Sequence, residues 1–282
     1  MKRNSRHGAS ASRHQDWRHP GERWRIFLRL AAAEGWRVTD CESKLFRGVF
    51  ADSGFALSAP EGAYGFITAV CHELNGWIGN LVVAGNDRGR GFGGALLDHA
   101  IGTLRGRGAR CLWLTASELG RPLYESRGFS VVDGVDRWAR VGEAVRAPSG
   151  VALVDTETII AADARVWGGS RRELLGHLAL DGEVYSNGAS VVLLQAPGPM
   201  RVLGPWIRDS HCDVAAVLSA AVAATPADIE IVTDVLRSSG LDMRLQQAGF
   251  RRQGYNALMA QGSTDHVDLS RLISLASLGS MG

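Results

Sequence analysis

The chain has 282 residues, a net charge of +2, 45% hydrophobic residues and 21% charged residues, as is typical of globular proteins that fold in water. Its length allows one large domain or two small ones, and so small a net charge gives no argument for nucleic-acid binding. No apolar run approaches the roughly 20 residues of a membrane span. The four cysteines are widely spaced and include no C-x-x-C pair, which argues against a zinc site or a disulfide framework. We therefore expect a cytoplasmic protein with free thiols and without a metal, a nucleic-acid partner or a membrane partner.

The first part of the chain predicts an arm, two helices and three strands. Residues 1–20 are basic and lack the apolar stretch of a secretory signal, so we expect a flexible basic arm. Apolar spacing predicts helices over 22–36 and 42–49, followed by strands over 54–60, 64–70 and 76–84. The joint CHELNG between the last two strands has the length and the Asn-Gly content of a hairpin turn.

A glycine-rich loop, NDRGRGFGG at residues 86–94, follows these strands. A helix with apolar residues at Leu97, Ile101 and Leu104 comes next, then a buried strand at 111–116 and a short helix at 120–129. Strand-like runs at 130–134 and 136–141 complete this half, and residues 143–150 have the composition of a linker.

The second half repeats this order of elements. It predicts a strand at 200–208, a helix at 212–224, a strand at 228–234 and a short helix at 243–250, which ends in Gly-Phe as the helix at 120–129 does. We interpret the chain as two diverged structural repeats of ~130–140 residues. The predicted domains are 21–142 and 151–262, with a tail at 263–282. Two unrelated α/β domains are the alternative.

The glycine loop has the chemistry of a phosphate site. Glycines let a backbone approach a ligand closely, and a helix N-terminus offers unpaired N–H groups to an anion. A Walker loop is excluded because the loop contains no lysine. A dinucleotide site is disfavoured because the following strand offers no acid about 20 residues beyond the loop. A structural turn with solvated arginines stays open.

Three pieces in order resemble the GNAT superfamily, the GCN5-related N-acetyltransferases. They are the strand GWIGNLVV (76–83), the loop RGRGFG (88–93), which fits R/Q-x-x-G-x-G/A, and the helix in LTASELGRPLYESRGF (114–129). The resemblance implies an α/β tandem GNAT fold in which each half has a mixed sheet flanked by helices. It also implies transfer of an acyl group, expected to be acetyl, from acyl-coenzyme A to a small-molecule primary amine. Coenzyme A would lie on Leu81, Val82, Val83, Arg88, Gly89, Arg90, Gly91, Phe92, Gly93 and Gly94.

The resemblance places Tyr124 at the usual position of the general acid. The general base stays open, because the strand before the loop carries no carboxylate. His72 and Glu73 at the preceding turn are candidates, and so are Asp40 and Glu42 in the helical region that often faces the acceptor in this family. A water-mediated base, or an amine that arrives neutral, is a further alternative.

The second half resembles the C-terminal domain of two-domain members of the superfamily more weakly. Its counterpart of the glycine loop, RDSHCDVAA (208–216), contains no glycine, so we expect only the first half to bind coenzyme A. Trp206 could line an acceptor pocket. Family members usually begin with a strand, which the segment at 9–21 does not resemble.

Two other functions stay open: an acyl-CoA-binding protein or thioester decarboxylase of this fold, and a nicotinamide-dependent oxidoreductase. We expect a monomer or a homodimer.

Overall fold

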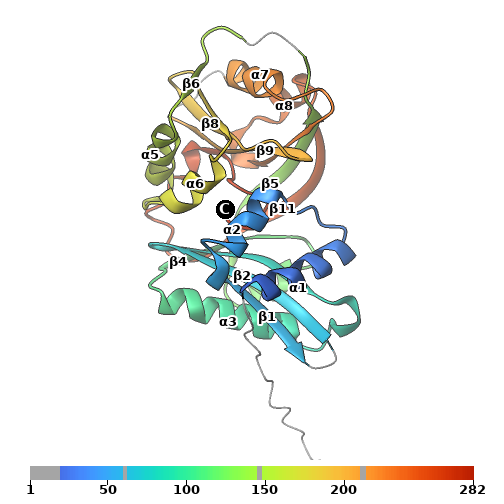
Figure 1. Cartoon of the computed structure of the whole chain (residues 1–282). Helices are drawn as coiled ribbons and strands as arrows, with labels where there is room; N and C mark the ends of the chain where they lie inside the picture. The colour runs from blue at the N-terminus through green and yellow to red at the C-terminus, as the bar shows by residue number, and fades with distance from the viewer. Residues whose placement is uncertain (1–19, 60–61, 145–147, 210–213) are drawn as a thin grey trace, which may run out of the picture.

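The computed structural model of the chain describes residues 20–59, 62–144, 148–209 and 214–282. The predicted arm and part of the predicted linker lie outside the described residues, as does nearly all of the segment in which the usual first strand would fall. The described residues form a twelve-stranded mixed sheet with helices on its faces (Figure 1). The predicted mixed α/β fold is confirmed.

In the first half, helices cover both faces of the strands. The helices α1 (Pro20–Ala33) and α2 (Asp40–Arg47) and the helix α3 (Phe92–Gly106) lie on opposite faces of β1 (Gly54–Ala59), β2 (Gly62–His72) and β3 (Asn75–Val83). Successive side chains of a strand point to opposite faces. Phe66 and Val70 accordingly pack with α1, and Ile67 and Ala69 pack with α3. The half continues through β4 (Cys111–Ala116), α4 (Arg121–Glu125) and β5 (Ser130–Val141), with short 3-10 turns at η1 (Ala51–Ser53) and η2 (Gly85–Asp87).

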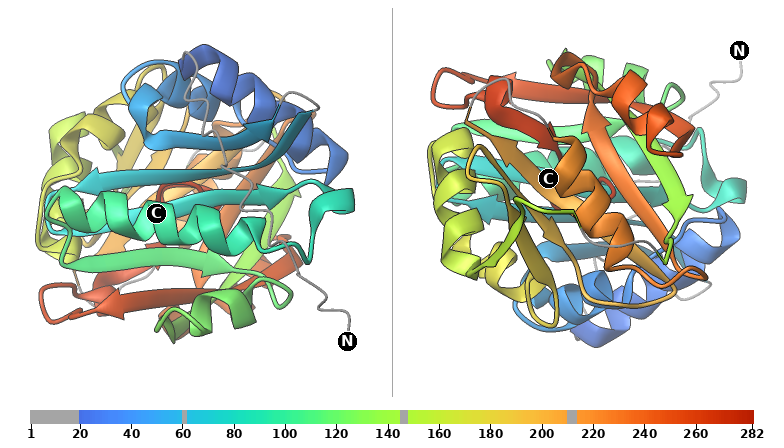
Figure 2. Two further views of the ribbon diagram at one scale, coloured as in Figure 1. Left: turned by 90° about the horizontal axis from the view of Figure 1, so that it is seen from below. Right: turned by 90° about the horizontal axis from the view of Figure 1, so that it is seen from above.

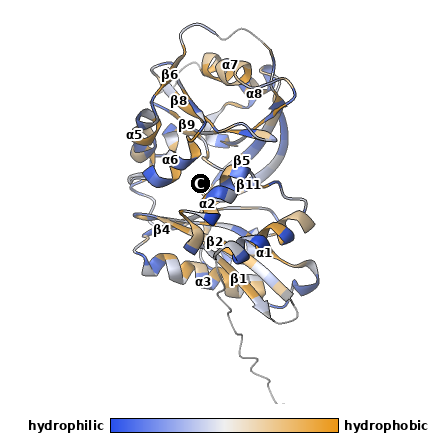
Figure 3. Cartoon of the chain, viewed as in Figure 1, coloured by the Kyte–Doolittle hydropathy of each residue, from blue (hydrophilic) through white to orange (hydrophobic). Residues whose placement is uncertain are grey.

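The second half begins with β6 (Ala152–Val154) and two helices, α5 (Thr156–Trp167) and α6 (Arg172–Leu178). The strands β7 (Glu183–Ser186), β8 (Ser190–Leu194) and β9 (Met200–Arg208) follow, then α7 (Ala215–Ala223), β10 (Glu230–Leu236), η3 (Arg237–Ser239) and α8 (Asp242–Gln247). The strand β11 (Arg251–Gly262), the turn η4 (Leu269–Arg271) and β12 (Leu272–Ser274) come last. Figure 3 shows α7 as largely hydrophobic, in keeping with its burial in the core of this half.

The two halves exchange a strand. The sheet order contains β4-β11-β5-β10, so β11 of the second half lies between two strands of the first half. In turn, β5 of the first half pairs along its length with β10 of the second half. One hydrophobic cluster runs through both halves, from Trp24 and Phe27 to Leu174 and Leu193. Each half therefore completes the sheet of the other.

The C-terminal residues lie in the middle of the molecule. The three views of Figures 1 and 2 place the end of the chain between the halves, and residues 275–277 and 280–282 are buried. The sequence analysis assigned these residues to a tail. Their actual place is at the junction of both halves, where they contact β3, β4 and β9.

Several predicted boundaries move by a few residues. The first helix ends at Ala33 and not at 36, because Gly35 adopts a left-handed conformation with φ 69°. The second helix begins at Asp40, because the Thr39 hydroxyl accepts a hydrogen bond from the Glu42 amide and caps it. The two strand-like runs at 130–141 form the single strand β5.

Candidate acyl-transfer site

The centre of the candidate site is a divergence of two parallel strands. β3 and β4 pair only from Asn75–Cys111 to Trp77–Trp113, although β3 continues to Val83. On its other side, the register of β3 with β2 shifts, with Thr68 opposite Gly79 and Phe66 opposite Val82. Asn80 lies in this bulge with φ 54°. The main chain of β3 beyond Trp77 therefore has no partner in β4.

A cavity of about 400 Å³ opens where the strands diverge. Ile78, Gly79, Asn80 and Leu81 of β3 line it, and Thr115, Ser117 and Tyr124 line it from the β4 side. Other lining residues come from the α1–α2 loop, from Glu42, and from Arg137, Met200, Val232, Gln253, Asn256 and residues 278–280. The cavity thus combines a strand that can hold a ligand by its main chain with titratable side chains from several elements. We refer to it as the transfer cavity.

Tyr124 is on α4 and is the titratable residue on the β4 side of the transfer cavity. Its side chain is 8% exposed and packs against Phe129 with ring centroids 6.2 Å apart. Burial raises the pKa of the phenol to about 12. The phenol is therefore protonated over the whole physiological range and serves as a hydrogen-bond donor.

Glu42 is the carboxylate of the transfer cavity. It is buried, and burial raises its pKa above the ordinary value of 4.5 because the charged form loses hydration. Hydrogen bonds from Asn80, whose Nδ2 donates to Oε1 over 3.0 Å, and from the Ser280 side chain act in the opposite direction, as does the charge of Arg137. A carboxylate with a raised pKa and an ordered geometry is suited to accept a proton from an amine.

The C-terminal residues close one side of the transfer cavity. The Trp77 indole Nε1 donates a hydrogen bond to the Gly279 carbonyl over 3.2 Å, and the Arg137 guanidinium donates to the Leu278 carbonyl over 2.9 Å. Gly79 has no room for a side chain, because a Cβ there would lie 2.4 Å from the Ser280 carbonyl oxygen. The segment is therefore tied to β3 and brings the Ser280 hydroxyl to Glu42.

The glycine loop lies between η2 and the start of α3. Gly89 and Gly91 adopt φ values of 75° and 85°, a region that side chains disfavour. Arg88 forms an ion pair with Glu34 at 2.5 Å, and Arg90 pairs with Asp87 at 2.5 Å. Arg90 also lies over the ring of Phe92, which itself stacks on Tyr64. The loop presents exposed guanidinium groups and backbone N–H groups together at a helix N-terminus, as an anion site requires.

His72 and Glu73, the two candidate bases at the hairpin turn, do not line the transfer cavity. His72 is buried in edge-to-face contact with Phe50, and burial, together with the charge of Arg171, lowers its pKa to about 3. The Glu73 carboxylate accepts a hydrogen bond from the Ser170 amide over 3.0 Å, which links the turn to the second half. The structure brings Tyr124 together with Glu42, Asn80 and Leu81, and gives His72 and Glu73 contacts elsewhere.

Sequence reasoning named Glu42 without preferring it and missed Ser280 and Arg137. One signal for Glu42 was available, because Glu42, Leu45 and Phe46 share the buried stripe of α2 at helical spacing. An acid on an apolar stripe needs a polar partner. No sequence pattern connects Ser280 to residue 42, since only the tertiary fold brings them together.

The other candidate residues have structural surroundings. Trp206 is fully buried in the core of the second half and does not line the transfer cavity. Among the described residues, no group of His, Cys, Asp or Glu could hold a metal ion. No helix in the described ranges is long and apolar enough to span a bilayer.

Comparison with known proteins finds a family model that matches part of the chain. Residues 50–131 match the family model described as acetyltransferase (GNAT) domain. No curated protein sequence matches the chain significantly. The match contains the diverging strand, the glycine loop and Tyr124.

Solved structures with the same fold extend over the whole chain. A protein from Pyrococcus horikoshii, described as a candidate acetyltransferase, superposes with a TM-score of 0.80 at 16% identity, covering 94% of this chain and 95% of its own. A GCN5-related N-acetyltransferase from Sphaerobacter thermophilus gives a TM-score of 0.62 at 16% identity, with coverages of 88% and 96%. A tandem GNAT protein from the clavulanic acid biosynthesis pathway gives 0.56 at 15% identity, with coverages of 87% and 96%. At these identities the likeness shows the fold.

Residues 50–131 thus match a GNAT acetyltransferase domain, and the rest of the chain shares the fold of these solved structures. The match over these residues supports an acyl-CoA-dependent acetyltransferase in general terms and leaves the acceptor open.

Proposed function

We propose that the protein transfers an acyl group, acetyl in the first instance, from acyl-coenzyme A to the primary amine of a small molecule. The observation that carries the proposal is the transfer cavity, which is lined by Tyr124, by Glu42 and by a stretch of β3 without a partner in β4. The cavity supplies three requirements of the reaction together: a place for an extended thioester arm, a proton acceptor and a hydrogen-bond donor.

Coenzyme A would bind by two parts of the first half. The main chain of Leu81, Val82 and Val83, which has no partner in β4, would pair with the amide groups of the pantetheine arm in place of the hydrogen bond that the Val83 carbonyl accepts from Arg88 Nε. The pyrophosphate would lie on the backbone N–H groups of residues 88–94, where the dipole of α3 and the charges of Arg88 and Arg90 favour an anion. To reach the phosphate, each of these arginines exchanges an acidic partner within the protein for the ligand.

The chemistry is direct attack by the amine on the thioester carbon. Glu42 would take a proton from the incoming ammonium, which leaves the nitrogen lone pair free to attack. A β3 amide would donate a hydrogen bond to the carbonyl oxygen as its charge grows, and one such donor contributes about 3 kcal/mol. The C–N bond forms, the C–S bond breaks, and the electron pair leaves on sulfur. The second proton of the attacking nitrogen then neutralises the thiolate, which gives the amide and free coenzyme A thiol.

Tyr124 would stabilise the departing sulfur. A thiol has an ordinary pKa of about 8.5, and burial raises the pKa of the phenol to about 12. Complete proton transfer from this phenol to the thiolate is therefore uphill, whereas a hydrogen bond to the growing negative charge is favourable. We assign Tyr124 this donor role.

The first experiment tests coenzyme A binding at the glycine loop. Calorimetric titration of the full chain with acetyl-CoA and with NADH is repeated on Gly91→Asp and Gly91→Asn. Both side chains tolerate the left-handed backbone of residue 91, and they differ by one negative charge at the proposed pyrophosphate position. We expect acetyl-CoA to bind the wild type and to bind Gly91→Asp far more weakly than Gly91→Asn.

Two results would count against the proposal. Binding of NADH in place of acetyl-CoA would support a nicotinamide site. Binding of acetyl-CoA without thiol release in the presence of any amine would support a non-transferring acyl-CoA protein.

A further inference from the structure

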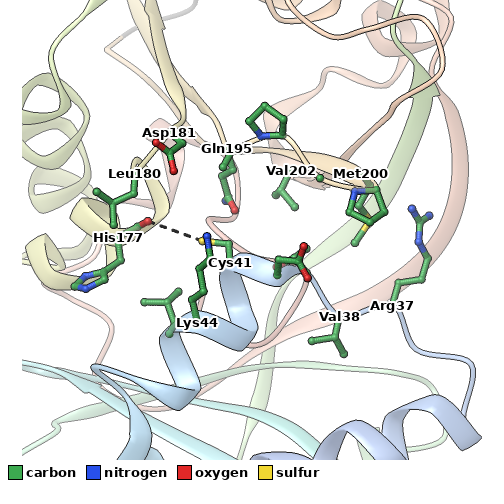
Figure 4. A pocket seen from close by; sticks show the side chains of 17 residues that line it. Arg37, Val38, Cys41, Lys44, His177, Leu180, Asp181, Gln195, Met200 and Val202 are labelled. Carbon is green, nitrogen blue, oxygen red and sulfur yellow. Dashed lines mark hydrogen bonds between the residues drawn. The ribbon is translucent and has the colours of Figure 1, made fainter.

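A second cavity, of about 330 Å³, adjoins the transfer cavity on the other side of α2. Figure 4 shows the residues that line it. One wall is α2 itself, and the opposite wall comes from the second half, namely the α6–β7 turn and the β8–β9 connection. The two cavities share Arg37, Val38 and Met200 among their lining residues. We refer to the second one as the interdomain cavity.

α2 separates the two cavities, because side chains on different sides of the helix line different cavities. Asp40, Cys41, Lys44 and Leu45 line the interdomain cavity, whereas Glu42 lines the transfer cavity. Residues two apart on a helix are about 200° apart around its axis, so Lys44 and Glu42 leave opposite sides of α2. A helix with its side chains is about 10 Å wide, and the two charged groups are therefore separated by roughly that distance.

Lys44 is distinctive in its chemistry. The chain contains only two lysines, Lys2 and Lys44, although it is rich in arginine. Figure 4 shows the Lys44 side chain extending from α2 into the interdomain cavity. Among the described residues Lys44 forms no ion pair, whereas Arg37, the other cation of the lining, is paired with Glu230. A flexible ammonium without a partner at a cavity wall is suited to bind an anionic group.

The rest of the lining defines what lies next to that anionic group. Val38, Leu45, Leu180, Pro197, Pro199, Met200 and Val202 provide apolar surface. Asp40, the first residue of α2, and Asp181, on the opposite wall, add two exposed carboxylates. The cavity thus offers one free cation, two carboxylates that attract an ammonium, and an apolar middle.

We propose that the amine acceptor is an elongated zwitterion with a primary amine at one end and a carboxylate at least about 10 Å away at the other, because the molecule must pass around α2 and not through it. Its carboxylate binds Lys44, its apolar body packs between α2 and the β8–β9 connection, and its ammonium passes Asp40 to reach Glu42. This inference rests on the proposed transfer reaction and specifies its acceptor.

The test uses acceptor probes that differ only in length or in charge. Rates of thiol release from acetyl-CoA are measured for the full chain with ω-aminobutanoate, ω-aminohexanoate, ω-aminooctanoate and octylamine. We expect kcat/KM to rise with length among the amino acids, because the longest comes nearest to spanning the path from Lys44 around α2 to Glu42. We also expect ω-aminooctanoate to exceed octylamine by about tenfold, the effect of one charge-assisted hydrogen bond.

Variants of α2 identify the group that binds the carboxylate. Lys44→Met keeps the length of the side chain and removes its charge. It should raise KM for ω-aminooctanoate about tenfold, with little change in kcat, in the rate with octylamine or in KM for acetyl-CoA. Lys44→Arg should retain most of the preference. Arg47→Met is the matched control, because residue 47 is a cation on the same helix that lines neither of the two cavities.

The outcomes separate this inference from the proposed function. Equal use of octylamine and ω-aminooctanoate, or an equal loss with both probes in Lys44→Met, would overturn the zwitterionic acceptor and leave acyl transfer in place. No thiol release with any of the amines would count against both.

Discussion

The two halves contain the same strand divergence, and the chain treats the two copies differently. In the first half β3 and β4 pair in parallel over three residue pairs and then separate. In the second half β9 and β10 do the same, from Glu230–Met200 to Val232–Val202. The first divergence opens into the transfer cavity. The second is filled by β12, which pairs with β9 through Leu272–Ile207 and Ser274–Trp206 and with β10 through Val235–Ser274.

This difference supports the proposal that the first half binds coenzyme A and the second does not. In the second half the backbone groups exposed by the divergence are paired within the protein, so an extended thioester arm has no free edge there. The same C-terminal segment continues to the first half, where it only lines the cavity and supplies Ser280 to Glu42. One stretch of chain thus closes the second copy of the site and completes the first.

The largest expected effect is on kcat, through the proposed proton acceptor of the transfer cavity. Glu42→Gln keeps the oxygen that accepts the Asn80 hydrogen bond and removes the proton acceptor, so kcat should fall by about 10²–10³. Glu73→Gln, at the hairpin turn, should leave kcat nearly unchanged. Steady-state thiol release with a fixed amine measures both. The reverse result would return the role of base to Glu73.

Two glycines that contact the C-terminal segment test its two roles separately. These roles are to fill the divergence of the second half and to complete the transfer cavity of the first. A Cβ at Gly204 would lie 2.0 Å from the Leu275 carbonyl oxygen, and one at Gly79 would lie 2.4 Å from that of Ser280. Gly204→Ala should lower the free energy of unfolding by about 3 kcal/mol, because β12 is paired on both sides and must shift. Gly79→Ala should lower stability less and activity more, because it displaces Ser280 from Glu42.

Urea denaturation and thiol release on the same two preparations measure this pair. If the two variants lose the same amount of stability and the same amount of activity, the C-terminal segment has one common role in both divergences.

His72, at the β2–β3 hairpin, connects the acid stability of the protein to the far end of β3 from the transfer cavity. The folded protein keeps it neutral to a pH near 3, whereas an unfolded chain protonates it below about 6.5. The unfolded chain therefore binds the extra proton between these values, and the free energy of unfolding should fall by up to about 1.4 kcal/mol per pH unit as the pH falls through this window.

His72→Phe should remove that part of the pH dependence, since its Nε2 has no hydrogen-bond partner to lose. Unfolding by urea at a series of pH values between 4 and 7, about the range of the shift, compares the variant with the wild type. Parallel curves would contradict a buried neutral His72, and a loss of kcat at unchanged stability would revive it as a base.

The smallest expected effect concerns the pH at which kcat begins to fall on the acid side, which we call the acid limb of the rate profile. The Ser280 side chain donates a hydrogen bond that lowers the pKa of Glu42 against the larger effect of burial. Ser280→Ala should therefore move the acid limb of kcat to higher pH, while the rate on the plateau stays nearly the same. A plateau that falls with an unmoved limb would indicate a packing role for residue 280 instead.

Much of the first half was predictable from local pattern. Alternating and helical apolar spacing located β1, β2, β3 and α3, and the order of strand, arginine-glycine loop and Leu-Tyr-x-x-x-Gly-Phe helix indicated the superfamily. The site was predictable in part. Tyr124 lies in the cavity as the motif suggested, whereas the turn residues His72 and Glu73 lie outside it, because a hairpin turn is at the far end of β3 from its bulge.

The sequence by itself determined the class of fold and the half that carries the glycine loop, because helix caps, turn glycines and apolar periodicity act between residues close in the chain. Tertiary structure alone decided the exchange of β5 and β11, the filling of the second divergence by β12, and the meeting of Glu42 with Asn80 and Ser280. These contacts join residues up to hundreds of positions apart, and their stability comes from paired backbone edges and shared burial, which no local pattern encodes.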